Sequence, residues 1–498
     1  MQASPSPPRQ GRLIRGILTY GLGGALSRLV GFLTLPLFTR FLTPQDYGVC
    51  SQLSLLALLL TPVFTVGIGT SLAICYFESQ ARKDRAAVVW TAFAILLVSS
   101  LILVAASFPA ARVVAHRLLG NAAFGDLVVI SVVGAAFSML TTPFSAFLQF
   151  EERSKLFVLL SNLSVLGAVA INVVLVAVLR MGVYGYVLGT CLGQVLTFAL
   201  YFWPILGWGP IHFARQAGRE LLRLGIPMVP SFAALYVLNH GNRFALQWFE
   251  SLQEVGVFSI GYALGAAMLV AVQAFTSAWT PYFMSFKDRQ DEGAVLFSKV
   301  MTYYVFAFGC LTFCFFAFAR PLVLLLTQPA FYAAFQVVGL VALGQFIQGC
   351  FAILLPPVYF AKDVKFQTMV QTLAAIASIG LGIVLVQAFG LIGAGLAFAG
   401  GFFLATMGQY LWNRHRGTQY LVVRYERRKV LLFGLLFSVL AGSLVLPRDW
   451  SLPLEFAAGI AATAMMCGAA AAILGRKELR DMLTWSRNLL PGAGQGTG

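Results

Sequence analysis

Apolar residues gather along the chain in long runs, and short polar segments that carry most of the charge separate these runs. A bilayer core takes roughly 20 helical residues at about 1.5 Å each, and every run reaches about that length. The pattern predicts an all-α polytopic membrane protein with about 14 transmembrane helices. It does not define the exact boundaries of helices eight and ten. The runs lie at 17–38, 49–74, 87–108, 124–148, 156–179, 182–206, 224–247, 256–283, 297–318, 335–358, 366–388, 390–412, 429–447 and 453–474.

Composition and charge agree with this pattern. Hydrophobic residues make up 59% of the 498 residues and charged residues 10%, whereas soluble proteins average about 45–50% and about 25%. With the N-terminus inside, 26 of the 34 Lys and Arg residues fall in cytoplasmic segments and seven in outer loops, and Arg28 lies within a run. The net charge of +16 therefore indicates membrane topology rather than a nucleic-acid partner. The asymmetry predicts that both termini lie in the cytoplasm.

Arg28 lies near the middle of the first apolar run. An arginine at the bilayer centre costs a few kcal/mol or more unless it faces water or a partner, and such residues are usually functional. We therefore expect Arg28 to line an internal cavity. The alternative is an arginine that only reaches toward the membrane surface.

The exit of this first helix carries a family resemblance. Pro36 and the segment Thr39-Arg40-Phe41-Leu42-Thr43-Pro44-Gln45-Asp46-Tyr47-Gly48 resemble the Wzx-type polysaccharide flippases of the multidrug/oligosaccharidyl-lipid/polysaccharide exporter superfamily. The segment 219–258 echoes this opening stretch, because Arg243-Phe244 matches Arg40-Phe41 and Glu254-Val255-Gly256-Val257 matches Asp46-Tyr47-Gly48-Val49. Six helices separate the copies, so both halves insert in the same sense, related by an axis along the membrane normal.

The duplication predicts the domain organisation. Residues 1–207 would form an N-terminal lobe of six helices and residues 219–412 a second lobe of six. A cytoplasmic linker at 208–218 would join the lobes on the inner surface. Residues 413–498 would hold the most basic loop, two further helices and a cytoplasmic tail, and contact between this loop and anionic lipids is expected.

The resemblance covers helices one to twelve and implies a function. A flippase of this kind lies in the bacterial cytoplasmic (inner) membrane. It moves undecaprenyl-pyrophosphate-linked oligosaccharide from the inner to the outer leaflet by alternating access, for polysaccharide, lipopolysaccharide or O-antigen biosynthesis. Its partners would be that lipid-linked substrate and membrane lipids, with transient contact to the glycan polymerase or ligase machinery. Helices one and seven pair across the lobes in this family.

The candidate substrate site follows from that pairing. Helix seven carries Tyr236 and a polar cluster at 239–243, at a spacing that places them on one side. Guanidinium groups bind pyrophosphate through bidentate hydrogen bonds, and amides suit sugar hydroxyls. Two alternatives stay open: Arg243 as an interfacial anchor and His240 as a packing residue. The candidate cavity residues are Arg28, Arg40, Asn239, His240, Asn242 and Arg243.

Catalysis and a bound cofactor have little support in the sequence. All 18 carboxylates lie in loops or at helix ends, the seven cysteines form no C-x-x-C, and no histidine pair has ligand spacing. We therefore expect no enzyme, metal site or cofactor. A coupling ion, Na⁺ or H⁺, stays undetermined, although a proton relay would lack its usual buried carboxylate.

Two alternatives to the flippase function remain. A multidrug or other lipid exporter of the same superfamily would usually bind cations at buried carboxylates, which are missing here. A membrane polysaccharide polymerase or ligase would usually present a larger outer loop. The chain also departs from its relatives, because Asn242 stands where many have an acid. Only Arg28 lies deep where the lipid II branch has several arginines, which weakens the case for lipid II as cargo.

Overall fold

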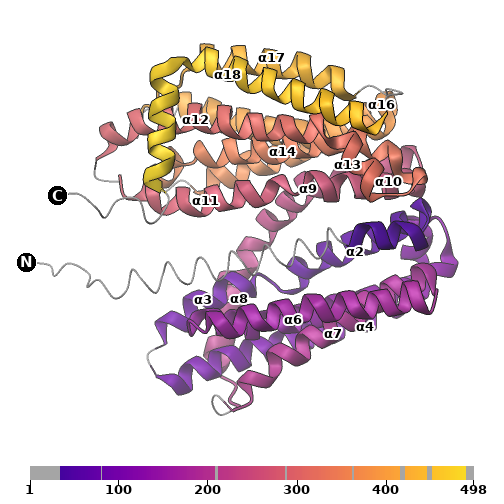
Figure 1. The fold of residues 1–498 in the computed structure, drawn as a ribbon. Coiled ribbons are helices and arrows are strands. Elements are labelled where there is room, and N and C mark those ends of the chain that lie inside the picture. Colours follow the sequence, from indigo (N-terminus) through magenta and orange to yellow (C-terminus); the bar gives the residue numbers. More distant parts are fainter. Residues whose placement is uncertain are drawn as a thin grey trace, which may run out of the picture. The chain divides into compact units, whose positions relative to one another are not determined.

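The protein is all-helical and divides into two compact units (Figure 1). The computed structural model describes residues 34–79, 81–207, 211–286, 289–361, 364–415, 421–445 and 451–489, and no strand occurs in these ranges. Unit 1 comprises the chain up to Tyr236 together with Leu252–Gly256, and unit 2 comprises Val237–Ser251 and the chain from Val257 onward. The prediction of an all-α protein is confirmed, whereas the lobes 1–207 and 219–412 with the linker 208–218 stay predictions.

Unit 1 packs its long helices side by side, with α5 in contact with α2, α4 and α7. Residues 34–41, the described end of the first apolar run, are helical. The further elements are α2 (Pro44–Phe64), α3 (Ile68–Glu78), α4 (Arg82–Leu119), η1 (Ala122–Phe124), α5 (Gly125–Phe150), α6 (Ser154–Val173), η2 (Val174–Val178), α7 (Gly182–Phe202), η3 (Trp203–Ile205), α8 (Arg215–Gly225) and η4 (Ile226–Met228).

Unit 2 is organised around α12 and α14, which pack against each other, and α17 and α18 pack on α12 (Figure 1). One of its core clusters is rich in phenylalanine, including Phe297, Phe306 and Phe313, each at most 1% exposed. The elements from α9 onward are α9 (Val229–Phe249), α10 (Leu252–Gly265), α11 (Met268–Met284), α12 (Gln290–Ala317), α13 (Ala319–Leu326), η5 (Pro329–Ala334), α14 (Phe335–Ile353), α15 (Pro356–Ala361), α16 (Val364–His415), α17 (Arg427–Val445) and α18 (Leu452–Leu489).

The described helices reproduce most of the predicted membrane spans. By length and composition, nine described helices could cross a membrane, or up to eleven if each of two bent pairs is one span. One of the nine, Phe366–His415, covers two predicted runs, which meet at Gly390. Gly390 has φ 52°, ψ −123°, a conformation that glycine adopts most readily. The predicted run at 429–447 corresponds to α17, and most of the run at 17–38 lies outside the described residues, so the total of 14 stays a prediction.

Two outer loops expected from the sequence contain helix instead. α4 continues through Pro109 as far as Leu119, beyond the predicted run 87–108. At about 1.5 Å per residue its 38 residues measure roughly 57 Å, nearly twice the thickness of a bilayer core. The segment expected as a loop at 319–334 likewise forms α13 and η5. Neither segment is long enough to hold a separate domain.

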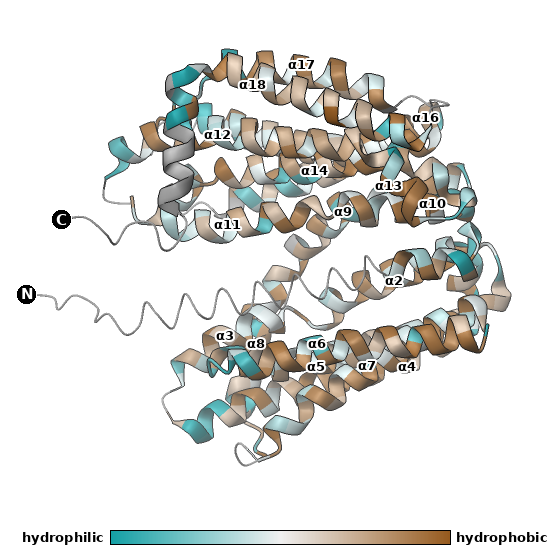
Figure 2. Cartoon of the chain, viewed as in Figure 1, coloured by the Kyte–Doolittle hydropathy of each residue, from teal (hydrophilic) through white to brown (hydrophobic). Residues whose placement is uncertain are grey.

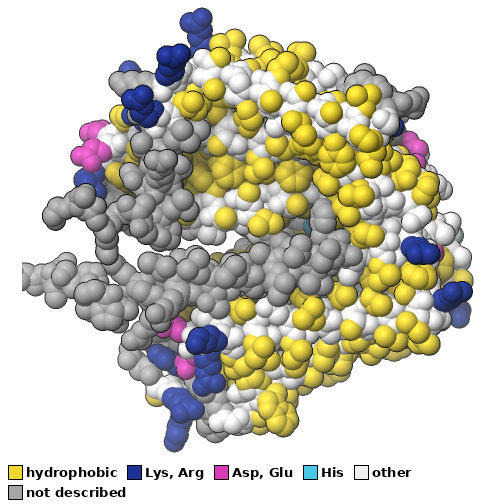
Figure 3. Space-filling model, viewed as in Figure 1, with side chains coloured by type: hydrophobic (Ala, Val, Ile, Leu, Met, Phe, Trp, Pro, Cys, Tyr) yellow, Lys and Arg dark blue, Asp and Glu magenta, His cyan; other side chains and the backbone are white. Residues whose placement is uncertain are grey.

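The surface of each unit has the polarity of a membrane protein. Figure 2 shows apolar residues through the middle of the helices and hydrophilic residues toward their ends. On the face drawn in Figure 3, hydrophobic side chains cover the middle of each unit, whereas Lys, Arg, Asp and Glu gather toward its two ends. Large exposed side chains such as Leu101, Phe108 and Leu435 belong to this apolar surface. Such a surface is stable in lipid and would aggregate in water.

The segment expected as an inter-lobe linker ends in a helix that packs on unit 1. α8 contacts α3 and α4, and its Leu221 is fully buried. The backbone N–H of Ala214, just before α8, donates a hydrogen bond of 2.9 Å to the Thr91 hydroxyl on α4. α8 therefore packs against α3 and α4 with its apolar face, while Arg215 and Arg219 are exposed.

Candidate functional site

A groove with several hydroxyl side chains among apolar ones lies within unit 1 between α2, α5 and α7, with a cavity volume of about 220 Å³. Small hydroxyl side chains repeat along its walls: Ser54 and Thr61 on α2 and Ser131 and Ser138 on α5 are each seven residues apart, two helical turns. Thr190 and Gln194 stand one turn apart on α7. The other lining residues are Cys50, Leu53, Ala57, Leu58, Gly134, Ala135, Tyr186, Val187 and Cys191.

Four of the groove hydroxyls, those of Ser54, Thr61, Ser131 and Thr190, donate their hydrogens to backbone carbonyls. Ser54 donates to the carbonyl of Cys50, and Thr190 donates to that of Tyr186, both at 2.8 Å. Ser131 on α5 donates across to the carbonyl of Leu53 on α2 at 3.0 Å, which ties these two walls together. A hydroxyl oxygen that has donated its hydrogen can still accept hydrogen bonds. These four hydroxyls therefore present acceptors to the groove, and the Gln194 amide adds both a donor and an acceptor.

Among the described residues that line this groove, none is Asp, Glu, Lys, Arg or His. It is thus a neutral, hydroxyl-lined cleft in an apolar surround, which suits a ligand that is rich in hydrogen-bond donors. Our sequence reasoning looked for charged and amide side chains and missed this groove. The seven-residue spacing of serine and threonine on two helices was the signal that could have revealed it.

The predicted cluster on α9 is largely committed to packing inside unit 2. The side-chain amide of Asn242, which is 7% exposed, donates a hydrogen bond of 3.0 Å to the Ala394 carbonyl on α16. Arg243, also 7% exposed, holds its guanidinium carbon 4.1 Å from the ring centroid of Tyr262 on α10. Phe258, one turn earlier on α10, faces the same guanidinium at 5.6 Å. The structure thus brings Asn242 and Arg243 into the core of the unit.

The remaining predicted site residues occupy different surroundings. His240 is half-buried, and its ring centroid lies 6.1 Å from that of Tyr262, while Asn239 is also half-buried. Tyr236 belongs to unit 1, where its hydroxyl donates a 2.8 Å hydrogen bond to the Leu55 carbonyl. Arg40 is exposed near the end of helix 34–41. Arg28 lies outside the described residues, so its place in the cavity stays a prediction.

The segment that carried the family resemblance has a clear structural role. Thr43 caps α2 through its hydroxyl, which accepts a hydrogen bond from the Asp46 N–H at 3.2 Å. The Asp46 carboxylate in turn accepts one from the Thr43 N–H at 3.0 Å, and Pro44 occupies the first helical turn. This is a capping box, which satisfies backbone donors at a helix start. These residues therefore start a helix rather than line the groove.

The repeated copy of that segment meets the first one. A Cβ on Gly48 would overlap the carbonyl oxygen of Leu252, at the start of α10, and a Cβ on Gly256 would overlap that of Pro44. Both contacts lie within unit 1, which includes Leu252–Gly256. Ser251 and Glu254 repeat the spacing of Thr43 and Asp46. The contact is therefore reciprocal, because each glycine lies against the start of the other helix.

Comparison with solved structures identifies the fold. The lipid II flippase MurJ in its inward closed conformation is similar with a TM-score of 0.70 at 13% identity, covering 92% of this chain and 100% of that one. An inward-facing multidrug resistance MATE family transporter of the MOP superfamily has a TM-score of 0.67 at 14% identity, covering 79% and 95%. The Vibrio cholerae MATE transporter VcmN in its bent form has a TM-score of 0.53 at 14% identity, covering 83% and 98%.

At such identities these likenesses establish a shared fold. No curated protein sequence matches the chain. The family model described as "Polysaccharide biosynthesis protein" matches residues 13–287, which is more than half of the 498 residues, and includes the capping segment, the groove and the α9 cluster. The predicted family is confirmed: with this match and the MOP-type transporter fold, the chain belongs to the polysaccharide biosynthesis protein family.

Proposed function

We propose that this protein is a flippase that moves undecaprenyl-pyrophosphate-linked oligosaccharide from the inner to the outer leaflet of the bacterial cytoplasmic membrane by alternating access. The family match and the shared fold support a transporter in polysaccharide biosynthesis. The observation that carries the proposal is the neutral, hydroxyl-lined groove of unit 1. Sugars are dense in hydroxyl donors, and the groove presents acceptors in a cleft without charge.

A drug exporter is the second candidate, because transporters of the MATE family share the fold. The same groove argues against it. A cationic drug taken from water into an apolar surround needs a compensating carboxylate, and the lining residues include none. A glycan needs only hydrogen-bonding groups, which the lining provides.

The sugar-binding part of the proposal can be tested by filling the groove. Thr190 is exposed on α7 and lines the groove, so Thr190→Phe would block it at little cost to folding. Leu192 is a matched control on the same helix, because it is also exposed, 41%, but lies outside the groove. In a strain that lacks its own flippase, Thr190→Phe should lose surface glycan by about tenfold or more, and Leu192→Phe should retain it at equal protein abundance.

The choice between cargoes needs a direct transport assay. In sealed vesicles that contain purified protein, a fluorescent lipid-linked oligosaccharide should become accessible to a membrane-impermeant reagent on the far side. Efflux of a cationic dye should stay at the level of empty vesicles. Dye efflux without glycan translocation would contradict the flippase function and support the drug-exporter function instead. Equal glycan export by Thr190→Phe and Leu192→Phe would show that the groove does not bind the glycan during transport.

A further inference from the structure

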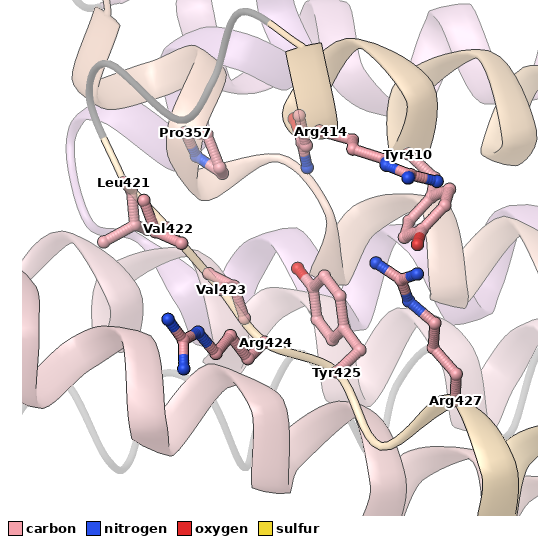
Figure 4. Close-up of a pocket in the computed structure, with 10 residues that line it drawn as sticks. Pro357, Tyr410, Arg414, Leu421, Val422, Val423, Arg424, Tyr425 and Arg427 are labelled. Atoms are coloured by element: carbon pink, nitrogen blue, oxygen red, sulfur yellow. The ribbon is translucent and has the colours of Figure 1, made fainter.

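A second cavity, of about 340 Å³, lies in unit 2 where α16 ends and α17 begins (Figure 4). Three arginines from different parts of this corner line it: Arg414 from the last turn of α16, Arg424 from the extended segment 421–426, and Arg427 from the first turn of α17. Its other lining residues are Pro357, Tyr410, Asn413, Leu421, Val422, Val423 and Tyr425. This cavity is separate from the groove between α2, α5 and α7.

Tyr410 lies between two of the arginines. Arg414 is one helical turn after Tyr410, so both side chains lie on the same face of α16. Arg427 holds its guanidinium carbon 5.5 Å from the Tyr410 ring centroid. In Figure 4 the side chains of Arg414 and Arg427 extend toward Tyr410, whereas the Arg424 guanidinium points away from them. The two guanidinium groups therefore border one part of the cavity.

The nearby acids do not neutralise these arginines. Glu426 and Glu478 both pair with Lys429, which lies outside the cavity lining. No carboxylate whose side chain the structure describes forms an ion pair with Arg414, Arg424 or Arg427. Like charges gathered in this way repel each other unless an anion joins them. These guanidinium groups therefore give the cavity a positive electrostatic potential, which favours binding of an anion.

The walls of the cavity are firm and partly apolar. Asn413 is buried, accepts from the Gln409 amide and donates to the Leu354 carbonyl, so the end of α16 is fixed. Leu421 is 5% exposed, and its neighbour Val422 lies open at the cavity edge. Burial raises the pKa of Tyr425, so its phenol keeps its proton and can donate a hydrogen bond. An anionic group with an attached apolar chain would fit these surroundings.

We propose that this corner is a phosphate-binding site, in which Arg414 and Arg427 hold a phosphate monoester or diester, with Tyr410 beside them. Guanidinium groups bind phosphate through bidentate, charge-assisted hydrogen bonds. An anionic phospholipid headgroup and soluble inorganic phosphate share this chemistry, and the test separates them. The apolar surface of α17 beside the site, where Leu431 and Leu432 are exposed, would accommodate an acyl chain. The proposal does not depend on the transported substrate.

The decisive comparison is between two neighbouring arginines. Arg427 lines the cavity and Arg428 does not, although both are exposed and carry the same charge. Full-length protein would be extracted from bilayers of phosphatidylglycerol and phosphatidylcholine, and retained phosphatidylglycerol counted by native mass spectrometry. Arg427→Gln should lower its retention by about tenfold, and Arg414→Gln with Arg427→Gln should abolish it, whereas Arg428→Gln should retain the wild-type level.

A second arm identifies the source of the phosphate. If inorganic phosphate raises the unfolding temperature of the wild type but not of Arg427→Gln, and no phosphatidylglycerol is retained, the ligand is soluble phosphate. Because Arg414, Arg427 and Arg428 are all exposed, size-exclusion profiles should show folded protein for every variant. Equal retention by Arg427→Gln and Arg428→Gln, or no response to either probe in the wild type, would overturn the proposal.

Discussion

Gly48 and Gly256 occupy equivalent positions in two copies of one sequence pattern, and each lies against the first turn of the other's helix. Gly48 of α2 faces the Leu252 carbonyl that begins α10, and Gly256 of α10 faces the Pro44 carbonyl that begins α2. Small residues permit backbones to approach this closely, and Cα–H···O contacts often accompany such approaches. The two copies of the sequence pattern are thus in direct backbone contact.

Alanine at either glycine should destabilise the protein. The added methyl group would overlap backbone atoms, which cannot rotate away, and overpacking of this kind costs about 1–3 kcal/mol. Gly48→Ala and Gly256→Ala should each lower the thermal unfolding temperature of the purified protein. Gly434→Ala is the matched control on α17, because nothing lies near its added Cβ and alanine favours helix by about 1 kcal/mol. An unchanged unfolding temperature in both test variants would contradict the close contact.

Arg320 and Glu455 should be coupled in stability. They form a 2.6 Å ion pair between α13 and α18, with side chains 21% and 8% exposed. Glu455 is therefore a buried carboxylate, which was not predicted from the sequence. Removing one partner from a buried pair leaves an uncompensated charge and costs about 3–5 kcal/mol. Arg320→Met and Glu455→Gln should each be destabilising, and the double variant should recover part of the loss. Additive losses in this double-mutant cycle, measured by chemical denaturation, would show that the pair is not coupled.

The aromatic face of Tyr262 should stabilise the buried Arg243. The guanidinium lies 4.1 Å from the ring centroid, and a desolvated cation–π contact is worth about 2 kcal/mol. Tyr262→Phe retains the ring face and should unfold close to the wild type, whereas Tyr262→Leu should lose about 2 kcal/mol or more. The measurement is thermal unfolding in detergent, and similar losses for Phe and Leu would assign the effect to the phenol hydroxyl instead.

Arg28 remains the sharpest functional prediction from the sequence. If it neutralises a pyrophosphate, Arg28→Ala should abolish glycan export at normal abundance, and Arg28→Lys should restore only part, because an ammonium lacks the planar fork. An arginine that only braces helices would tolerate Arg28→Met. Complementation of a flippase-deficient strain separates these outcomes, and full export by a well-expressed Arg28→Met variant would end the substrate-site hypothesis.

The expected topology can be tested independently of transport. Reporter fusions after Arg215 and after Lys362 should report the cytoplasm, and fusions near Arg180 and Arg448 should report the outer side, because basic residues concentrate on the cytoplasmic side. Alkaline phosphatase and green fluorescent protein give complementary signals for the two sides. A periplasmic signal at Arg215 would contradict the expected orientation.

Hydrophobic patterning was sufficient for the helical architecture because a bilayer leaves few other solutions for a chain so rich in apolar runs. It missed the extension of α4 to Leu119, since polar residues in 109–119 look like a loop when only hydropathy is read. It did separate the runs on either side of Gly390, where the backbone departs from helical geometry and two helices of α16 meet at a kink. Hydropathy thus located the membrane-spanning segments, but it did not locate the end of α4, which extends beyond its predicted span.

The site was harder to predict, because the side chains that line a cavity are decided by packing between distant helices. Asn242 and Arg243 look like ligand-binding residues in the sequence, yet Ala394 and Tyr262, which bind them, lie on other helices. The groove hydroxyls look ordinary, and only the meeting of α2, α5 and α7 makes them a surface. Residue spacing along one helix predicts which side chains share a face. The packing of neighbouring helices decides whether that face is accessible to a ligand.

The hydroxyl groove has a consequence for selectivity. The hydroxyls of Ser54, Ser131 and Thr190 each donate a hydrogen bond to a backbone carbonyl. They can therefore bind a ligand only as acceptors, through lone pairs with little directional preference. Such a lining distinguishes a sugar from a hydrocarbon, but it discriminates poorly between one sugar and its epimer. Under the proposed function, a change in the glycan repeat would need few compensating changes here, and one carrier could serve a biosynthetic repertoire that diversifies faster than the carrier itself.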